Sequence, residues 1–536
     1  MAIIELLEAL TWPRFLGCVV LLIVAGFVVD YSLLPRLPTN MARVGYDWGL
    51  WGHIKSNLLY FVRQKEWIDE GYAKYGKKGV PFLVPAGFSR LPDVVLPRSM
   101  LSWLLDQPEE AVDAHAAHND IIYGDYNFLD PSLIRDTFGS RAIQRWLNRS
   151  LPSLLPAIED EARHAVESTL GHVGPEWTEM KLWDVWLAVV PPVTNRILAG
   201  ANICRDRRYL DAVVAFTHAV LRNCVLLRLC PAVLHPAIGR LLCWANWRHW
   251  RRADERLRPV IVARLEAMTL KARGEAHLKD WEPPEDLVTW LIRLALEEGR
   301  SRELCPAVIS KRLLPLEFAS IDTTVLTGQL WMLDLLSSPP EVLDAIVKEY
   351  LAHQPKDGSP WSKTALLSLV RVDSSIRESQ RKTNFHTTLI ERVVLSPAGV
   401  RLPDSEWILP RGVHLTVNLN GSHHDAEFYQ DADEYDALRF ARLRKDRKQE
   451  AGQENANLPL GMVSMNDHHF PFGHGRFICP GRFFVAHELR LLGYYLLVHY
   501  EFRMVGERPR ARWIGSGMVP PFGVRVQVRR RQGAGA

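Results

Sequence analysis

The sequence has few cysteines for its length, and no two of them have metal-binding spacing. Seven cysteines are scattered through 536 residues, and no Cys-x-x-Cys pair occurs. Their odd number gives no sign of a disulfide framework, and the missing pairs give no sign of a zinc site. Cys224, Cys230 and Cys243 lie in apolar, helical sequence and are expected to be inert core residues. Cys479 differs, because glycines and a proline surround it.

The sequence also lacks a strong charge of one sign. Lysine and arginine total 65 against 61 aspartate and glutamate residues, which gives a net charge of +4. A nucleic-acid-binding protein carries a much stronger basic bias, so that class is excluded. Hydrophobic residues make up 47% and charged residues 24%, which is an ordinary globular balance with ample material for a core.

Long apolar runs are scarce, and only one approaches a membrane span. The run "FLGCVVLLIVAGFVV", continued through "DYSLL", covers the 20 residues 15–34, about 30 Å of helix and the thickness of a bilayer core. Asp30 interrupts it. A secretory signal is the alternative, but no small-x-small cleavage site follows. Pro35 and Pro38 form a stiff break after the run. Residues 1–38 are therefore predicted to be a membrane anchor and hinge, and residues 39–536 the globular domain.

Charges near this run indicate its orientation. Glu5 and Glu8 precede it, whereas Arg36 and Arg43 follow it, and this bias favours a globular body on the cytoplasmic side. The later stretch "WRHWRRADERLR", residues 247–258, is basic and aromatic. It fits either a solvated helix face or a contact with anionic lipid headgroups.

Most of the chain after residue 51 consists of long amphipathic stretches with few glycines, which is typical of helices. Residues 53–76 predict one helix, and residues 140–350 predict helix almost throughout. Short strands are expected at "PFLVPAG", "DVVLP", "TTLIERVVL", "WILPRGVHLTVNLN" and "GVRVQVRR". The sequence therefore predicts one large, mostly α domain with small β-sheets.

One stretch near the carboxyl end, "FPFGHGRFICPGRFFVAHEL" (residues 470–489), carries the strongest functional signal. Phe472, Gly475, Cys479 and Gly481 follow one another at short intervals, and an amphipathic helix begins after them. The glycines let the backbone turn and approach a flat ligand closely. The amides and dipole at the start of that helix stabilise a thiolate on the cysteine.

This stretch resembles the haem-binding loop of cytochromes P450, in the form found in filamentous fungi. The resemblance implies a cytochrome P450 fold and a haem b cofactor, with Cys479 as the axial ligand of the iron, where a thiolate favours O–O cleavage. It also implies that Phe472, Gly475 and Gly481 bind the cofactor.

One position departs from the family pattern. Two residues before the cysteine the family usually has arginine or histidine, whose cation holds a haem propionate, but here Phe477 stands there. The adjacent Arg476 would point the other way in an extended segment. Arg392 is therefore expected to bind the propionate instead.

A second motif of the family is Glu-x-x-Arg, which "RESQR" supplies as Glu378 and Arg381. Residues at i and i+3 share a helical face and can pair. By itself such a pair is usually a surface salt bridge. The resemblance implies that Arg439 joins them, 40 residues before Cys479, and that the three residues support the haem loop.

The third motif, "EFASIDTTVLTG", resembles the oxygen-activating segment of the family's long central helix. Ala319 and Ser320 are small where dioxygen must fit, although the family usually has glycine at the second position. The resemblance implies that Asp322 and Thr323 are catalytic and relay protons during oxygen reduction. Pro315 is expected to kink the helix upstream.

Together the motifs imply a microsomal haem-thiolate monooxygenase, single-pass in the endoplasmic reticulum membrane with a cytoplasmic catalytic domain. Only 55 residues follow Gly481, so electrons from NADPH are expected through a separate reductase. The basic stretch at residues 439–449 fits either attraction of an acidic reductase surface or a solvated loop.

The reaction and the substrate are less defined. The fungal form of the loop suggests hydroxylation or a related C–H oxidation of an apolar small molecule in secondary metabolism. Oxidative coupling, desaturation or ring formation share the same iron chemistry, and a non-catalytic haem-binding membrane protein is a distant alternative. The sequence does not separate these outcomes, and it identifies neither the substrate nor the oligomeric state.

Overall fold

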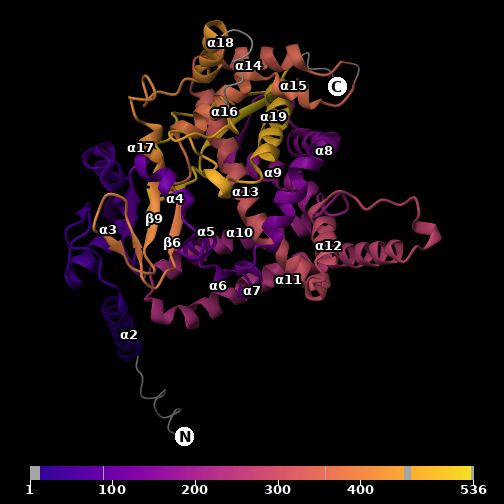
Figure 1. The fold of residues 1–536 in the computed structure, drawn as a ribbon. Coiled ribbons are helices and arrows are strands. Elements are labelled where there is room, and N and C mark those ends of the chain that lie inside the picture. The colour runs from indigo at the N-terminus through magenta and orange to yellow at the C-terminus, as the bar shows by residue number, and fades with distance from the viewer. Residues whose placement is uncertain (1–11, 89, 357, 452–459, 533–536) are drawn as a thin grey trace.

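The computed structural model describes residues 12–88, 90–356, 358–451 and 460–532, and Figure 1 shows its ribbon. It is mostly helical with small sheets, as the sequence predicts. The helices are α2 (Trp12–Leu33), α3 (Leu50–Lys74), α4 (Leu101–Asp106), α5 (Ala114–Ile121), α6 (Gly124–Asn127), α7 (Pro131–Arg135), α8 (Phe138–Leu170), α9 (Leu182–Leu198), α10 (Arg207–Arg228), α11 (His235–Ala272), α12 (Leu287–Glu297), α13 (Pro306–Leu336), α14 (Pro340–His353), α15 (Lys363–Leu367), α16 (Val370–Lys382), α17 (Leu419–His423), α18 (Arg439–Ala451) and α19 (Arg482–His499).

The strands form four sheets. The largest has six strands in the order β1-β2-β3-β9-β6-β4, another has the order β10-β13-β5, and two have two strands each, β11-β12 and β7-β8. Their bounds are β1 (Ala42–Arg43), β2 (Phe82–Val84), β3 (Asp93–Leu96), β4 (Val112–Asp113), β5 (Thr178–Lys181), β6 (Thr388–Val394), β7 (Val400–Arg401), β8 (Ile408–Leu409), β9 (His414–Asn418), β10 (Tyr500–Met504), β11 (Arg512–Ile514), β12 (Gly517–Val519) and β13 (Arg525–Arg530).

The main core surrounds α13, which crosses the middle of the molecule (Figure 1). This cluster joins apolar residues of α8, α9, α12, α13 and α19, among them the fully buried Trp186, Trp290 and Trp331. A second cluster lies on the six-stranded sheet. Pro315 lies inside α13, and the helix continues through it, because the packing of its buried neighbours, such as Leu313 and Leu314, outweighs the loss of one backbone hydrogen bond.

The predicted elements are largely confirmed. The expected helix at residues 53–76 is α3, and each expected strand segment contains a strand. Residues 140–350 consist of helices and their connections, apart from β5, which the polar sequence "TEMK" did not signal. β5 forms because it pairs with β13, whose residues lie 344 to 350 positions later in the chain, and local sequence cannot show such a pairing.

The apolar run near the amino terminus forms α2, and residues 16–33 are long and apolar enough to cross a membrane. Asp30, which interrupts the run, is buried. Its carboxylate accepts hydrogen bonds from the amides of Ala232 and Val233 in the α10–α11 connection. The second helix that passes the same test is α10, half of which is buried inside the protein.

Candidate active site

The loop before α19 presents the sulfur of Cys479. Gly473 and Gly475 adopt positive φ values of 80° and 69°, which a glycine accepts without strain. The amide of Cys479 donates to the carbonyl of Phe472 at 2.9 Å. Gly481, the residue before α19, has an ordinary φ of −81°. A Cβ there would lie 3.9 Å from the sulfur, so the glycine keeps the space beside the sulfur open.

The side chain of Cys479 is closely surrounded by protein atoms but is not fully buried. Part of its surface is accessible to solvent, yet burial raises the pKa of its thiol, and hydrogen bonds from the amides of Gly481 and Arg482 oppose that rise. The two amides stabilise a thiolate, as the start of α19 predicts.

A strip of accessible residues runs along α13, although both flanks of the helix are core. Ala319 is exposed and Leu316, Ser320, Thr323 and Thr327 are partly accessible. They recur every three or four residues and therefore share one face. The neighbouring residues Glu317, Ile321, Thr324 and Val325 are buried. α13 also packs against α19, the helix that follows the cysteine loop.

Asp322 and Thr323 lie on this part of α13. Both carboxylate oxygens of Asp322 are buried and make no hydrogen bond, and Nε2 of His218 on α10 lies 3.6 Å from one of them. The hydroxyl of Thr323 donates to the carbonyl of Ala319 at 2.7 Å. A carboxylate without a hydrogen-bond partner beside an accessible hydroxyl can hold and transfer a proton.

Glu378, Arg381 and Arg439 form a buried ionic triad. Arg381 and Arg439 donate to Glu378 at 2.8 Å and 3.0 Å, and the side chains of Glu378 and Arg381 are fully buried. Arg381 also donates to the carbonyls of His423 and Ala432 at 2.6 Å. The pair is therefore not a surface salt bridge. It ties α16, α17 and the start of α18 together.

Arg392 is buried on β6 and lies over Phe477. Its guanidinium carbon is 4.7 Å from the ring centroid, and it forms no ion pair with a carboxylate in the described part of the chain. Burial, and then the charge of Arg476, lower the pKa of Arg392 to about 10. A bulge between Leu389 and Arg392, with Ile390 at a φ of 62°, directs this strand toward the loop.

The segment around Arg476 is not extended, contrary to the expectation from the sequence. Residues 475–477 form one turn of 3-10 helix, because the positive φ of Gly475 turns the chain. Arg476 is exposed, its guanidinium carbon lies 5.0 Å from the Phe477 ring, and it donates to the carbonyl of Gln107. It does point outward, but through the turn and not through strand alternation.

The sequence did not signal several titratable groups whose pKa values are shifted. His118 lies on α5, and the surrounding protein, followed by His115, lowers its pKa. Burial and the charges of Arg228 and His118 lower the pKa of His386 to about 4. Burial and then Asp93 raise the pKa of Glu391 to about 7. These residues are scattered along the chain, and no local spacing could have grouped them.

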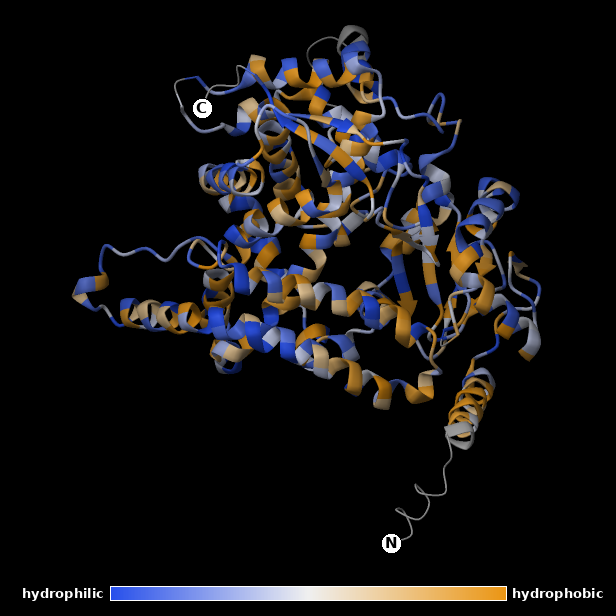
Figure 2. Cartoon of the chain, turned by 180° about the vertical axis from the view of Figure 1, so that it is seen from behind, coloured by the Kyte–Doolittle hydropathy of each residue, from blue (hydrophilic) through white to orange (hydrophobic). Residues whose placement is uncertain are grey.

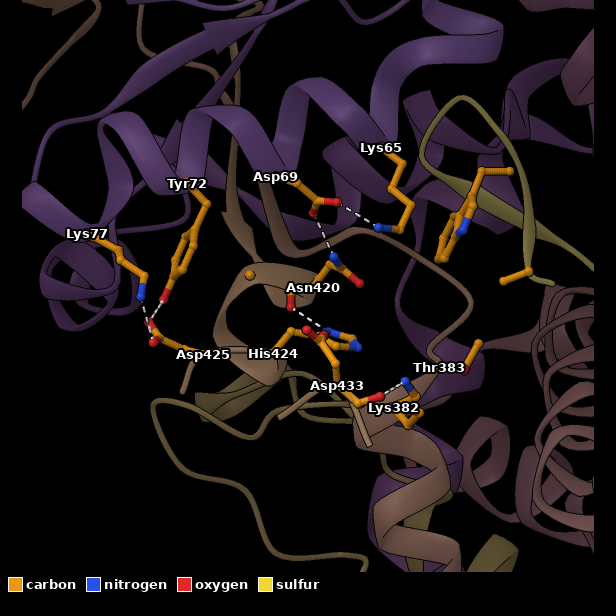
Figure 3. Close-up of a pocket in the computed structure, with 13 residues that line it drawn as sticks. Lys65, Asp69, Tyr72, Lys77, Lys382, Thr383, Asn420, His424, Asp425 and Asp433 are labelled. Atoms are coloured by element: carbon orange, nitrogen blue, oxygen red, sulfur yellow. Dashed lines mark hydrogen bonds and ion pairs between the residues drawn. The ribbon is translucent and has the colours of Figure 1, made fainter. Parts of the chain in front are cut away.

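A separate hollow of about 350 Å³ lies on the surface between α3 and α17, as Figure 3 shows. Its charges are paired within the protein: Lys65 with Asp69 at 2.6 Å and Lys77 with Asp425 at 2.7 Å. It contains none of the predicted site residues.

Comparisons with known proteins agree with this geometry. The profile of the family described as Cytochrome P450 matches residues 140–522. Cytochrome P450 monooxygenase gloP of Glarea lozoyensis is 28% identical over 96% of this chain and 95% of its own length. Cytochrome P450 monooxygenase polB of Polytolypa hystricis is 29% identical over 97% and 99%. Cytochrome P450 monooxygenase olcJ of Penicillium canescens is 30% identical over 82% and 79%.

Proposed function

Because the chain belongs to the cytochrome P450 family, we propose that it inserts one atom of O2 into an apolar small molecule of fungal secondary metabolism. The chemistry of the family is that of a monooxygenase with a haem cofactor, with electrons from NADPH supplied through a reductase. The observation that supports this reaction best is Cys479, whose partly accessible sulfur lies just before α19 and receives hydrogen bonds from the amides of Gly481 and Arg482. The fungal relatives and the fungal form of the loop support the metabolic setting.

The residues at the site fit a haem. A soft thiolate suits iron, and Cys479 receives two amide hydrogen bonds that favour this charge state. The glycines at 475 and 481 and the ring of Phe472 border the place where a flat group would lie. Arg392, a buried cation without a carboxylate partner, would hold a propionate. When bound, the haem supplies the reductive activation of O2.

The remaining site residues would transfer protons or hold the haem loop in position. Asp322 would take up a proton and Thr323 would pass it toward the reacting oxygen, while Ala319 leaves room beside them. The triad of Glu378, Arg381 and Arg439 would hold the segments behind the haem loop. The partly accessible hydroxyl of Thr323 and the buried carboxylate of Asp322 next to it on α13 favour a catalytic protein over a passive haem carrier.

The reductase would approach the face that carries the haem loop. The basic stretch at residues 439–449 was expected to attract it, but several of its arginines form ion pairs within the protein. Arg439 pairs with Glu378, Arg442 with Asp436, and Arg444 with Asp373 at 2.6 Å. We therefore assign steering of an acidic partner to Lys445, an exposed cation of this stretch that forms no ion pair among the described residues.

We also propose that residues 1–38 anchor the protein in the endoplasmic reticulum membrane and that residues 39–536 form the cytoplasmic haem domain. Figure 2 shows apolar residues along α2. The nearby α10–α11 connection and the start of α11 expose Leu229, Val233, Leu241 and Trp244. The hydrogen bonds of Asp30 join α2 to this connection, so the anchor and the apolar surface form one membrane-facing side.

Carbon monoxide binding to the reduced, haem-loaded protein tests the haem-thiolate assignment. We expect the strongly red-shifted Soret band of a thiolate ligand, and we expect Cys479→Ser to abolish it while the protein stays folded. Cys305→Ser, at an exposed cysteine, is the matched control and should keep the band. A normal band in Cys479→Ser would overturn the assignment.

A further inference from the structure

The middle of α11 carries two exposed arginines, Arg248 and Arg252, that form no ion pair in the described part of the chain. Residues 247–258 contain five arginines and two acids. Three of these arginines pair with acids: Arg251 with Glu255, Arg256 with Asp206 and Arg258 with Asp254. Both acids of the stretch are therefore already paired, and its excess positive charge belongs to Arg248 and Arg252.

Exposed tryptophans accompany the arginines of this stretch. The guanidinium carbon of Arg248 lies 5.0 Å from the ring centroid of Trp244, and that of Arg251 lies 5.3 Å from the ring centroid of Trp247. Trp244 is 59% exposed and Trp247 is 39% exposed. Large apolar side chains that gather on a surface mark interaction sites. Indoles beside basic side chains are typical of the boundary between water and lipid tails.

These residues form one line along the outer face of α11. Leu241, Trp244, Arg248 and Arg252 are all exposed and are spaced three, four and four residues apart, so they share a helical face. The opposite face is buried against the protein, with Trp250 among its residues. The outer face is apolar toward the start of the helix and basic toward its middle.

A third exposed arginine, Arg222 on α10, joins this surface. Burial and then the charges of Arg252, Arg222 and Arg248 lower the pKa of His249, so the three guanidinium groups gather around one side chain. Like charges that lie close together repel one another. No carboxylate of the described residues pairs with any of the three, so an anion bound among them would relieve this repulsion.

The outer face of α11 is continuous with α2, the proposed anchor. The carboxylate of Asp30, near the carboxyl end of α2, accepts hydrogen bonds from the amides of Ala232 and Val233, just before α11. This contact holds the start of α11 near the level at which an anchoring α2 would leave the membrane. In Figure 1, α2 projects from the same side of the molecule that α11 borders, and α11 runs across its direction. The outer face would therefore lie along the lipid headgroups.

We propose that the outer face of α11, with Trp244, Arg248 and Arg252, binds the phosphate groups of anionic membrane lipids. This inference rests on the proposed function, because it needs α2 to be a membrane anchor. The apolar end at Leu241 would enter the boundary of the lipid tails, and the arginines would reach the phosphates, to which a guanidinium can donate two parallel hydrogen bonds. An acidic protein would match the arginines, but the exposed Leu241 and Trp244 beside the anchor favour lipid.

Arginine modification by phenylglyoxal, followed residue by residue with mass spectrometry, tests the proposal on the full-length, haem-loaded protein. The protein is held in nanodiscs of phosphatidylcholine alone or of equal amounts of phosphatidylcholine and phosphatidylserine. Because a cation gains free energy near an anionic lipid surface, we expect the modification of Arg248 and Arg252 to be about fivefold slower in the anionic discs. High salt should remove the difference. Inorganic phosphate added to the phosphatidylcholine discs should not reproduce it, since the free ion lacks the membrane that holds the lipid phosphates beside α11.

Arg503 is the matched control. It is exposed, lies over Trp177 with its guanidinium carbon 4.2 Å from the ring centroid, and forms no ion pair among the described residues. It lies on β10, near the carboxyl end of the chain and far from α2 in Figure 1, so its modification rate should be the same in both discs.

Equal rates at Arg248 and Arg252 in the two discs would overturn the proposal and make this stretch a solvated helix face. Equal slowing at Arg503 would also overturn it, because the lipid would then act on the reagent and not on α11. Protection that depends on added reductase and not on lipid charge would assign the surface to an acidic protein. Retention of the protein in phosphatidylcholine discs and its carbon monoxide spectrum separate these results from a failure of the anchor or of the haem assignment.

Discussion

Arg392 covers one face of the Phe477 ring, with its guanidinium carbon 4.7 Å from the ring centroid. The aromatic ring stabilises the cation and positions it beside the cysteine loop, where the family usually supplies the cation from the loop itself. The sequence thus replaces a charged residue in the loop by a ring that holds an arginine from β6.

Arg392→Ala should accelerate haem loss. Arg392 is buried, so a propionate bound to it makes a charge-assisted hydrogen bond, and its removal should raise the rate of transfer to apo-globin about tenfold to a hundredfold. Phe477→His, which adds a hydrogen-bond donor at the loop, should slow the transfer. Arg401→Ala, at an exposed arginine, should leave the rate unchanged, and an unchanged rate in Arg392→Ala would assign the propionate to other residues.

Glu378→Gln should destabilise the protein strongly. The substitution leaves Arg381 and Arg439 without their shared carboxylate in a buried setting, and breaking such a pair costs about 3–5 kcal/mol. Glu501→Gln makes the same change in a partly exposed pair with Arg529, which is worth about 1 kcal/mol or less. Thermal unfolding of the two variants compares them directly, and similar melting temperatures would show that the triad is not a stabilising element.

The pH dependence of stability should reveal Glu317. Burial raises the pKa of this carboxyl to about 8, although Tyr209 and Asn195 donate hydrogen bonds to it at 3.0 Å and 3.1 Å. The folded state then binds a proton that the unfolded state releases above about pH 4.5. Stability therefore falls as the pH rises toward 8 and levels off beyond it.

Glu317→Gln removes this titration, so the melting temperature of the unaltered protein relative to the variant should decrease between pH 5 and pH 8. Glu501→Gln serves again as the control, because it makes the same substitution at a partly exposed carboxylate elsewhere in the fold. A constant difference between Glu317→Gln and the unaltered protein across this range would show that Glu317 titrates normally.

Local sequence predicts the parts of the site that lie close together in the chain. The cysteine loop is a turn followed by a helix, and its glycines and amides act within ten residues. Glu378 and Arg381 are three residues apart on one helix, so their pairing follows from helical geometry. Helix and strand positions are likewise confirmed, since their periodicity is local.

What the sequence could not show depends on contacts across the fold. In the sequence, Asp30 is a charged residue that interrupts an apolar run. In the structure, its carboxylate accepts a hydrogen bond from the amide of Ala232, 202 residues later. In the sequence, Arg228 is only the last residue of a helix. In the structure, it donates a hydrogen bond to the hydroxyl of Tyr60, 168 residues earlier. The bulge at Ile390, two residues before Arg392, contains no glycine. The sequence therefore gives no sign of it.

Glycosylation tests the proposed topology. The sequons at Asn148 and Asn420 differ in the structure: Asn148 is exposed on α8, whereas Asn420 donates to Asp69 at 2.7 Å. An exposed sequon in a lumenal domain is open to modification, so a cytoplasmic domain should leave Asn148 unmodified. Asn148→Gln should then migrate like the unaltered protein after endoglycosidase treatment, and a shift on treatment that this variant abolishes would place the domain in the lumen.

Thr323→Ala should uncouple NADPH consumption from substrate oxidation. In the reconstituted system with a P450 reductase, NADPH consumption should continue while hydrogen peroxide rises and product per NADPH falls about tenfold or more, since a positioned proton donor is typically worth at least that. Thr327→Ala is the matched control: it lies one turn further on the same face of α13 and makes the same 2.7 Å bond to the carbonyl four residues earlier. If both variants produce equal peroxide, the effect comes from the packing of α13 and not from the hydroxyl of Thr323. If only Thr323→Ala does, proton delivery depends on that hydroxyl and on its neighbour Asp322.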